Sequence, residues 1–244
     1  MTCERFKIGQ FSEYQESHHT ARYRYAQLFV AGKSVLDIAC GTGYGCAMLK
    51  NAGAENVRGI DLSLEAIEYA TKTYLAQGIE FTMGNAECLS DLKSESFDVV
   101  TSFETIEHLP NVGLYLSEIH RVLRPGGIYI VSTPDRRLAS TMYPIRGKPN
   151  NEFHVREYTR TELISLLETK FKIKECLGQT YVAWPLVLWP IQVALKTTCY
   201  IFRSLGAYQV INNIYHNSRD VDVESSRDHK WAVASFWIFR AERN

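Results

Sequence analysis

The eleven-residue stretch VLDIACGTGYG, from Val35 to Gly45, limits the possible folds of this chain more than any other feature. Its first half is an unbroken apolar run, typical of a strand that is buried on both faces. Glycines then alternate at positions 41, 43 and 45, so the backbone can lie against a ligand and offer N–H groups to an anion. A glycine-rich turn directly after a buried strand is typical of nucleotide-binding α/β proteins.

Strand and helix patterns alternate along the first half of the chain. Five strands are predicted at SVLDIA, NVRGID, IEFTMGN, FDVVTSF and IYIVST, with helical periodicity between them. FKIKECL and WAVASFWIFRA predict a sixth and a seventh strand, separated by an unusually long connection. Strands joined through helices favour right-handed crossovers. We therefore expect an α/β fold: a Rossmann-like, doubly wound, seven-stranded and mostly parallel sheet, with a long insert before the last strand.

One domain is expected over residues 1–244. Ser63 stands where a helix N-cap belongs, and Thr159 with Glu162 forms a T-x-x-E capping box. The expected parts are an N-terminal helical cap (1–32), a cofactor-binding core (33–135), a substrate-side loop, helix and sixth strand (136–180), an aromatic insert (181–230) and the last strand (231–244).

Composition excludes several classes of partner. Lys plus Arg equals Asp plus Glu, at 27 each, so no basic field favours nucleic acid. The six cysteines are scattered without a C-x-x-C pair, which argues against a zinc site or a disulfide framework and favours the cytoplasm. The histidines and acids show no metal-ligand spacing, so no metal is predicted.

The glycine run does not fit the commonest nucleotide motifs. The dinucleotide fingerprint needs a third small residue, and that position is Cys46 or Met48 here. A P-loop needs a Lys after its glycines, and this sequence has none there. What is present is D-x-x-x-G-x-G-x-G, with Asp37 four residues before the first glycine.

This pattern resembles that of the class I S-adenosylmethionine-dependent methyltransferases (methyltransferase type 11-like). GIDLS, GNAECL, FDVVTSFETIEHL and EIHRVLRPGGIYIVSTP are similar to further motifs of the same family, over about 150 residues. The resemblance implies S-adenosyl-L-methionine as cofactor, with S-adenosyl-L-homocysteine as product. It also implies that Asp61 accepts both ribose hydroxyls and that Asn85, where the family often has Asp, borders the adenine with Ala86 and Glu87. The other implied cofactor contacts in the core are Asp37, Ala39, Gly41, Gly43, Leu62 and Phe103. Asp37 has an alternative role, which is to hold the glycine loop or cap the next helix.

The N-terminus resembles a subgroup of bacterial methyltransferases associated with surface-glycan synthesis. ERF, HHTARYRYA and NEFHVREYT carry this likeness, although the subgroup more often has Pro at the position of Glu152. By that resemblance, Arg22 and Tyr23 close over the methionine end of the cofactor. Arg can pair with a carboxylate through two hydrogen bonds, and an aromatic face favours a sulfonium. The alternative is a solvated, amphipathic entry helix.

Two histidines are candidate catalytic residues. His108 follows the fourth strand at its carboxyl end, where doubly wound sheets bind ligands, and His154 lies in a polar stretch before the capped helix. Either could be the base that a hydroxyl acceptor needs, and a structural role is the alternative for each. Glu104 and Glu107 share the loop of His108, where acids also favour a helix start.

The predicted function is methyl transfer, with O-methylation of a sugar or glycan-pathway acceptor in bacteria as the first candidate. The alternatives are a methyltransferase for a small molecule (a quinone, polyketide or lipid) and a protein that binds the cofactor without turnover. The expected partners are a small-molecule or glycan substrate and no nucleic acid.

The insert begins with YVAWPLVLWPIQVAL, which is apolar, too short to span a bilayer and interrupted by two prolines. Three interpretations stay open: a lid or subunit interface, a cap in which Trp184 and Trp189 stack on sugar rings, and shallow contact of residues 181–219 with an anionic bilayer. The third would place a cytoplasmic protein at the inner face of the membrane.

Overall fold

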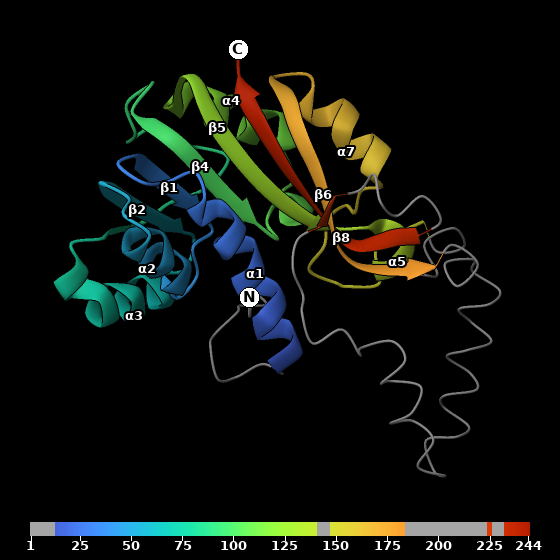
Figure 1. The fold of residues 1–244 in the computed structure, drawn as a ribbon, viewed down its shortest axis with the longest axis horizontal. Coiled ribbons are helices and arrows are strands. Elements are labelled where there is room, and N and C mark those ends of the chain that lie inside the picture. Colours follow the sequence, from blue (N-terminus) through green and yellow to red (C-terminus); the bar gives the residue numbers. More distant parts are fainter. Residues whose placement is uncertain (1–12, 141–146, 184–223, 226–231) are drawn as a thin grey trace, which may run out of the picture.

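The computed structural model describes residues 13–140, 147–183, 224–225 and 232–244, and they form one sheet covered by helices (Figure 1). The strand order is β3-β2-β1-β4-β5-β8-β6-β7. Pairing is parallel from β3 to β5 and antiparallel from β5 through β8 and β6 to β7. The strands are β1 Ser34–Ile38, β2 Asn56–Asp61, β3 Glu80–Met83, β4 Phe97–Phe103, β5 Leu123–Pro134, β6 Phe171–Ala183, β7 Glu224–Ser225 and β8 Ala232–Arg243.

Two apolar cores, one on each face of the sheet, hold the helices in place. Val35 packs into the core that includes Ala26, Leu49 and Ile67, whereas the next residue, Leu36, packs into the other core. This alternation is what a strand buried on both faces requires. The helices on the first face are α1 Glu13–Gln27, α2 Tyr44–Asn51 and α3 Leu64–Tyr74, and those on the second are α4 Val112–Val122 and α7 Arg160–Leu167.

The predicted sheet is confirmed, with two differences in detail. A two-residue strand, β7, pairs with β6 at the edge, so the sheet has eight strands rather than seven. Strand β6 also runs on to Ala183, beyond the expected limit of 180, because Tyr181 to Ala183 pair with β8. The first three residues of the expected insert are therefore strand. Its remainder up to residue 223 lies outside the described residues, and so do Trp184 and Trp189. No helix within the described ranges is long and apolar enough to cross a bilayer.

Local capping follows the sequence closely. The Ser63 hydroxyl accepts a hydrogen bond from the Ala66 N–H at 3.2 Å, and the Thr159–Glu162 capping box is formed in both directions. Helix α4 ends at Val122, one residue before the RPGG sequence, which lies within β5 at an irregularity in its pairing with β4.

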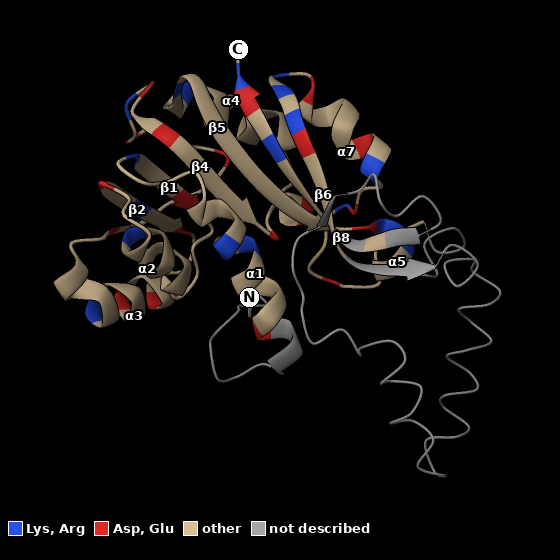
Figure 2. Cartoon of the chain, in the orientation of Figure 1, with Lys and Arg blue, Asp and Glu red and all other residues tan. Residues whose placement is uncertain are grey.

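The antiparallel end of the sheet carries alternating charges, visible as bands along β6 and β8 in Figure 2. Lys174 pairs with Glu242 at 2.5 Å and Arg240 with Glu175 at 3.4 Å. These partly exposed pairs contribute little stability each, but like charges on facing strands would be unfavourable. The charges therefore support the register of the two strands.

Candidate functional site

The strand order places the candidate site at the carboxyl ends of β1 and β4. These neighbouring strands are where the connections of a doubly wound sheet diverge, and ligands bind outside such a point. Both strands lead into a residue with left-handed backbone, Ala39 with φ 57° and Glu104 with φ 52°. Left-handed backbone is uncommon for residues other than glycine and is concentrated at ligand sites.

Asp61, at the end of β2, holds the glycine loop. Its carboxylate accepts the Gly41 N–H at 2.8 Å through Oδ2 and the Ser63 N–H at 2.9 Å through Oδ1. Gly43 has φ +80°, and a Cβ there would lie 2.7 Å from the Phe81 ring. The glycine positions of the loop thus carry no side chain, and they lie close to an acid whose oxygens can also accept hydrogen bonds from the hydroxyls of a ribose.

We expect Asp61→Ala to weaken S-adenosylmethionine binding by about 1.5–3 kcal/mol, the usual scale for the loss of a charged hydrogen-bond partner. The substitution also leaves the Gly41 N–H without its acceptor, so the loop loses its anchor. Isothermal titration calorimetry measures the effect. Glu80→Ala is the matched control, because that acid is exposed on the neighbouring strand. Unchanged affinity in the Asp61 variant would remove this residue from the site.

Asp37 lies fully buried behind the glycine loop rather than in the open cleft. Its carboxylate accepts hydrogen bonds from the Tyr23 hydroxyl (3.0 Å), the Thr101 hydroxyl (2.7 Å) and the Cys46 thiol (3.4 Å). Burial nevertheless raises the pKa of Asp37 to about 6, although the three donors act against that shift. These contacts support the alternative, a structural role for Asp37 beside the glycine loop, in which it joins α1, β4 and the start of α2.

Asp37→Asn should flatten the pH dependence of stability. The carboxyl pKa is higher in the folded state than in the unfolded state, so Asp37 favours folding below pH 4 and this contribution is lost as the pH rises to about 6. The loss amounts to about 2 kcal/mol between pH 4.5 and 7. Urea unfolding of the variant and the parent across this range measures it.

Asp98→Asn is the matched control for this experiment. The pKa of Asp98 is lowered by the Ser34 N–H and the Arg124 guanidinium, so its contribution to stability is lost only as the pH falls below about 4, and its substitution should leave the slope between pH 4.5 and 7 nearly unchanged. If Asp37→Asn and the parent have parallel curves, the carboxyl of Asp37 does not titrate in this range.

The residues implied to border the adenine surround the end of β3. The Asn85 side chain accepts the Glu87 N–H at 2.9 Å, Glu87 accepts the Asn111 N–H, and Ala86 packs against the core. Leu62 follows Asp61 with its side chain exposed. The structure therefore brings Asn85, Ala86, Glu87 and Leu62 to the same edge as Asp61, and their contacts with a cofactor stay a prediction.

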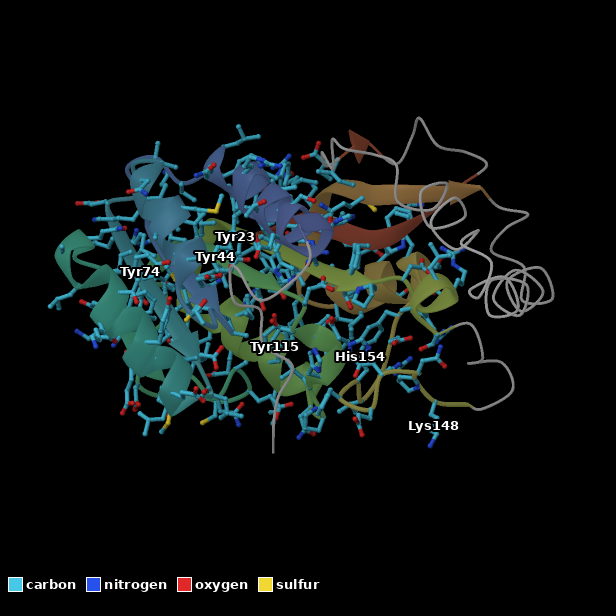
Figure 3. The ribbon with its side chains drawn as sticks, turned by 90° about the horizontal axis from the view of Figure 1, so that it is seen from below. Tyr23, Tyr44, Tyr74, Tyr115, Lys148 and His154 are labelled. Carbon is cyan, nitrogen blue, oxygen red and sulfur yellow. The ribbon has the colours of Figure 1, made fainter. Side chains whose placement is uncertain are left out.

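The N-terminal residues have buried partners. Arg22 is 1% exposed, and its guanidinium lies over the Phe236 ring, bonds to Gln179 at 3.1 Å and pairs with Glu104 at 3.3 Å. The Tyr23 ring meets Phe103 edge-on at 4.9 Å; Figure 3 labels Tyr23 beside Tyr44, whose ring is 5.3 Å away. Arg22 thus reaches the end of β4 through Glu104, and Tyr23 with Phe103 lies behind the glycine loop.

The two candidate catalytic histidines come together across 46 positions of sequence. Their rings meet edge-on with centroids 4.8 Å apart. His108 donates from Nδ1 to the Phe153 carbonyl at 2.9 Å, and the Val155 and Arg156 N–H groups both bond to the Glu107 carbonyl. These backbone bonds fasten the loop of His154 (labelled in Figure 3) to the carboxyl end of β4.

Two buried acids, Glu107 and Glu157, complete this cluster. The sequence pointed only to Glu107, as an acid that favours a helix start. Glu157 is fully buried, and its Oε1 lies 2.7 Å from His154 Nδ1. Glu107 is 1% exposed and accepts a hydrogen bond from Thr133 at 2.9 Å. Burial and the nearby Glu104 raise the pKa of Glu107 well above its usual range. The H-x-x-E spacing of His154 and Glu157 was the available signal for this pairing.

The comparisons with known proteins agree with this geometry. Residues 36–131 match the family model described as a methyltransferase domain. The chain is 37% identical, over 73% of its length and 67% of the relative, to a probable S-adenosylmethionine-dependent methyltransferase of Mycolicibacterium smegmatis. It is 34% identical, over 64% of its length and 72% of the relative, to a ubiquinone biosynthesis O-methyltransferase of Burkholderia orbicola.

A solved structure of similar fold comes from Thermotoga maritima, an S-adenosylmethionine-dependent methyltransferase described as a possible histamine N-methyltransferase. It aligns with a TM-score of 0.62 and 20% identity over 95% of this chain and 92% of that one. At this identity the likeness shows the fold alone. The sequence relatives, together with the anchored glycine loop and Asp61, show that the chain belongs to the class I S-adenosylmethionine-dependent methyltransferases and is an enzyme that uses S-adenosyl-L-methionine as its cofactor.

Proposed function

We propose that this enzyme is an O-methyltransferase that acts on a hydroxyl group of a small molecule. The observation that carries the proposal is the pair of histidines, His108 and His154, with rings 4.8 Å apart beyond the carboxyl end of β4. Methyl transfer to a hydroxyl requires that the acceptor lose its proton, whereas an amine needs little help. A cluster of imidazoles and buried acids at the ligand edge of the sheet supplies groups for that step.

The tautomer of His154 suits a proton acceptor. Its Nδ1–H is directed to the Glu157 carboxylate, and its Nε2 accepts from the Asn151 amide at 3.1 Å. Nε2 therefore carries a lone pair that could take a proton from an acceptor, while the negative Glu157 would stabilise the charged ring. His108 has the same polarity, since its Nδ1–H is used by the Phe153 carbonyl.

A hollow of about 480 Å³ lies next to the segments that carry these histidines, although neither histidine lines it, and it could receive part of an acceptor. Its lining includes the residues that directly follow His108 and His154. The lining residues are Leu109, Pro110, Val112, Val155, Arg156, Tyr158, Glu162 and Leu166. Its mixed apolar and charged character fits a small organic acceptor with hydroxyl groups.

Two acceptor classes are candidates. A sugar or glycan-pathway hydroxyl is proposed on the resemblance of the N-terminus and of NEFHVREYT to the glycan-associated subgroup. A phenolic hydroxyl of a quinone-type molecule is proposed because one group of relatives is named ubiquinone biosynthesis O-methyltransferase. The sugar hydroxyl has the higher pKa of the two and so depends more strongly on the histidine cluster.

The test is transfer of a labelled methyl group from S-adenosylmethionine to a panel of nucleotide sugars, glycolipids, catechols and primary amines. The proposal expects an O-methylated product from one of the hydroxyl classes and none from the amines. Mass spectrometry of the product locates the methyl group. Methylation of amines alone, or turnover that is unaffected by loss of both histidines, would contradict it.

A further inference from the structure

The strongest unexplained feature of the site is a carboxylate oxygen of Glu107. This side chain is 1% exposed, and its Oε1 has no hydrogen-bond partner among the described residues, whereas Oε2 is bonded by Thr133. A buried carboxylate oxygen that lacks a partner costs free energy unless it is protonated or meets a cation.

One nitrogen of each of two imidazoles lies close to this carboxylate. One ligand-type atom each from Glu107, His108 and His154 can be chosen so that all three lie within 4.8 Å of one another. Ligand atoms placed about 2.0–2.2 Å from one ion at tetrahedral angles are about 3.4 Å apart. Side-chain shifts on the order of 1 Å, in residues at the base of a loop, would therefore close the cluster on an ion.

The hydrogen bonds around the two rings are those that metal-binding histidines usually make. His108 Nδ1 donates to the Phe153 carbonyl, and His154 Nδ1 donates to the Glu157 carboxylate. Each ring consequently has its lone pair on Nε2, and a carboxylate behind one ring increases its basicity. An ion would replace the Asn151 amide as the partner of His154 Nε2.

We propose that Glu107, His108 and His154 bind one divalent transition-metal ion, of the class of Zn²⁺, Mn²⁺ or Fe²⁺. Two imidazoles and one carboxylate favour these ions over Mg²⁺ and Ca²⁺, which prefer oxygen ligands. Three protein ligands leave positions open for an oxygen of the acceptor, whose pKa a bound cation would lower. That catalytic consequence rests on the proposed O-methyl transfer, but the binding of the ion does not.

Bound cations require imidazole and carboxylate ligands in their deprotonated forms. Metal binding should accordingly release protons and grow stronger as the pH rises.

The experiment titrates the full chain, stripped with a chelator and free of any affinity tag, with Co²⁺ while its visible d–d absorption is recorded. A Cys88→Ser background removes the thiol that is exposed among the described residues, a competing ligand. We expect one Co²⁺ per chain, displaced by Zn²⁺ but not by Mg²⁺. His108→Ala and His154→Ala should each weaken binding on the order of 100-fold, and Glu157→Gln about 10-fold, the usual range for a residue behind a ligand.

His120→Ala is the matched control, because this histidine of α4 packs against Phe171, outside the cluster. Thermal melts without metal establish that each variant is folded. The proposal is overturned if the parent shows no saturable Co²⁺ site, or if the site persists unchanged in both histidine variants. Metal binding without methyl transfer would contradict the proposed function but not the metal proposal. Methyl transfer by a parent protein that shows no saturable Co²⁺ site would contradict the metal proposal but not the proposed function.

Discussion

Gly45→Ala is expected to destabilise the protein by about 3 kcal/mol and to abolish most cofactor binding, the largest stability effect of any single methyl group in the glycine loop. A Cβ at this position would lie 2.0 Å from Cζ of Tyr23 and 2.4 Å from its hydroxyl oxygen. The ring cannot turn aside cheaply, because it is packed edge-on against Phe103 and Tyr44 and its hydroxyl is bonded to Asp37. Either α1 or the start of α2 must therefore move.

Urea denaturation and calorimetry with S-adenosylmethionine measure the two effects. Gly113→Ala is the matched control: a Cβ there meets nothing within 4 Å, and the residue lies in the first turn of α4. Alanine should leave stability unchanged or raise it slightly at that position. The double variant Tyr23→Ala/Gly45→Ala should lose less than the sum of the two single changes, because the clash is then gone. Additive losses would show that Tyr23 is not what makes glycine necessary.

The glycine loop could be predicted from the sequence, but the contact between Gly45 and Tyr23 could not. Buried strands and glycine-rich turns are local patterns, so SVLDIA and the glycine run predicted β1 and the loop that follows it. The Ser63 cap and the Thr159 capping box are local as well, and both are confirmed. The closeness of Gly45 to Tyr23, in contrast, depends on how α1 packs against α2 on one face of the sheet. No periodicity within either segment contains that information.

The histidine cluster was open to sequence analysis only in part. His108 was found by its place after the fourth strand and His154 by its polar loop, each as a separate candidate. Their meeting depends on backbone bonds from Val155 and Arg156 to the Glu107 carbonyl, which join segments 48 residues apart. The expectation that no metal binds stays a prediction: it rested on ligand spacing along the sequence, whereas the proposed site joins residues of two distant segments.

His154→Ala should lower the turnover number by about 100-fold or more while leaving the affinity for S-adenosylmethionine within about twofold, the range expected for a group that acts on the acceptor's proton. The ring is bonded to Glu157 and Asn151 and touches His108, whereas the glycine loop is held by Asp61. The loss is expected whether Nε2 takes the proton itself or ligates an ion that lowers the acceptor's pKa, because both routes use the same lone pair.

Steady-state kinetics with the acceptor found in the panel, and calorimetry with the cofactor, separate the two quantities. His120→Ala should keep the parent's turnover, since the His120 ring on α4 packs against Phe171 of β6. Glu157→Gln should fall between the two, because a neutral amide stabilises a charged imidazole ring less than a carboxylate does. Equal losses of turnover and cofactor affinity in His154→Ala would instead show that His154 has a structural role in its loop. Methyl transfer to a hydroxyl would then need another base.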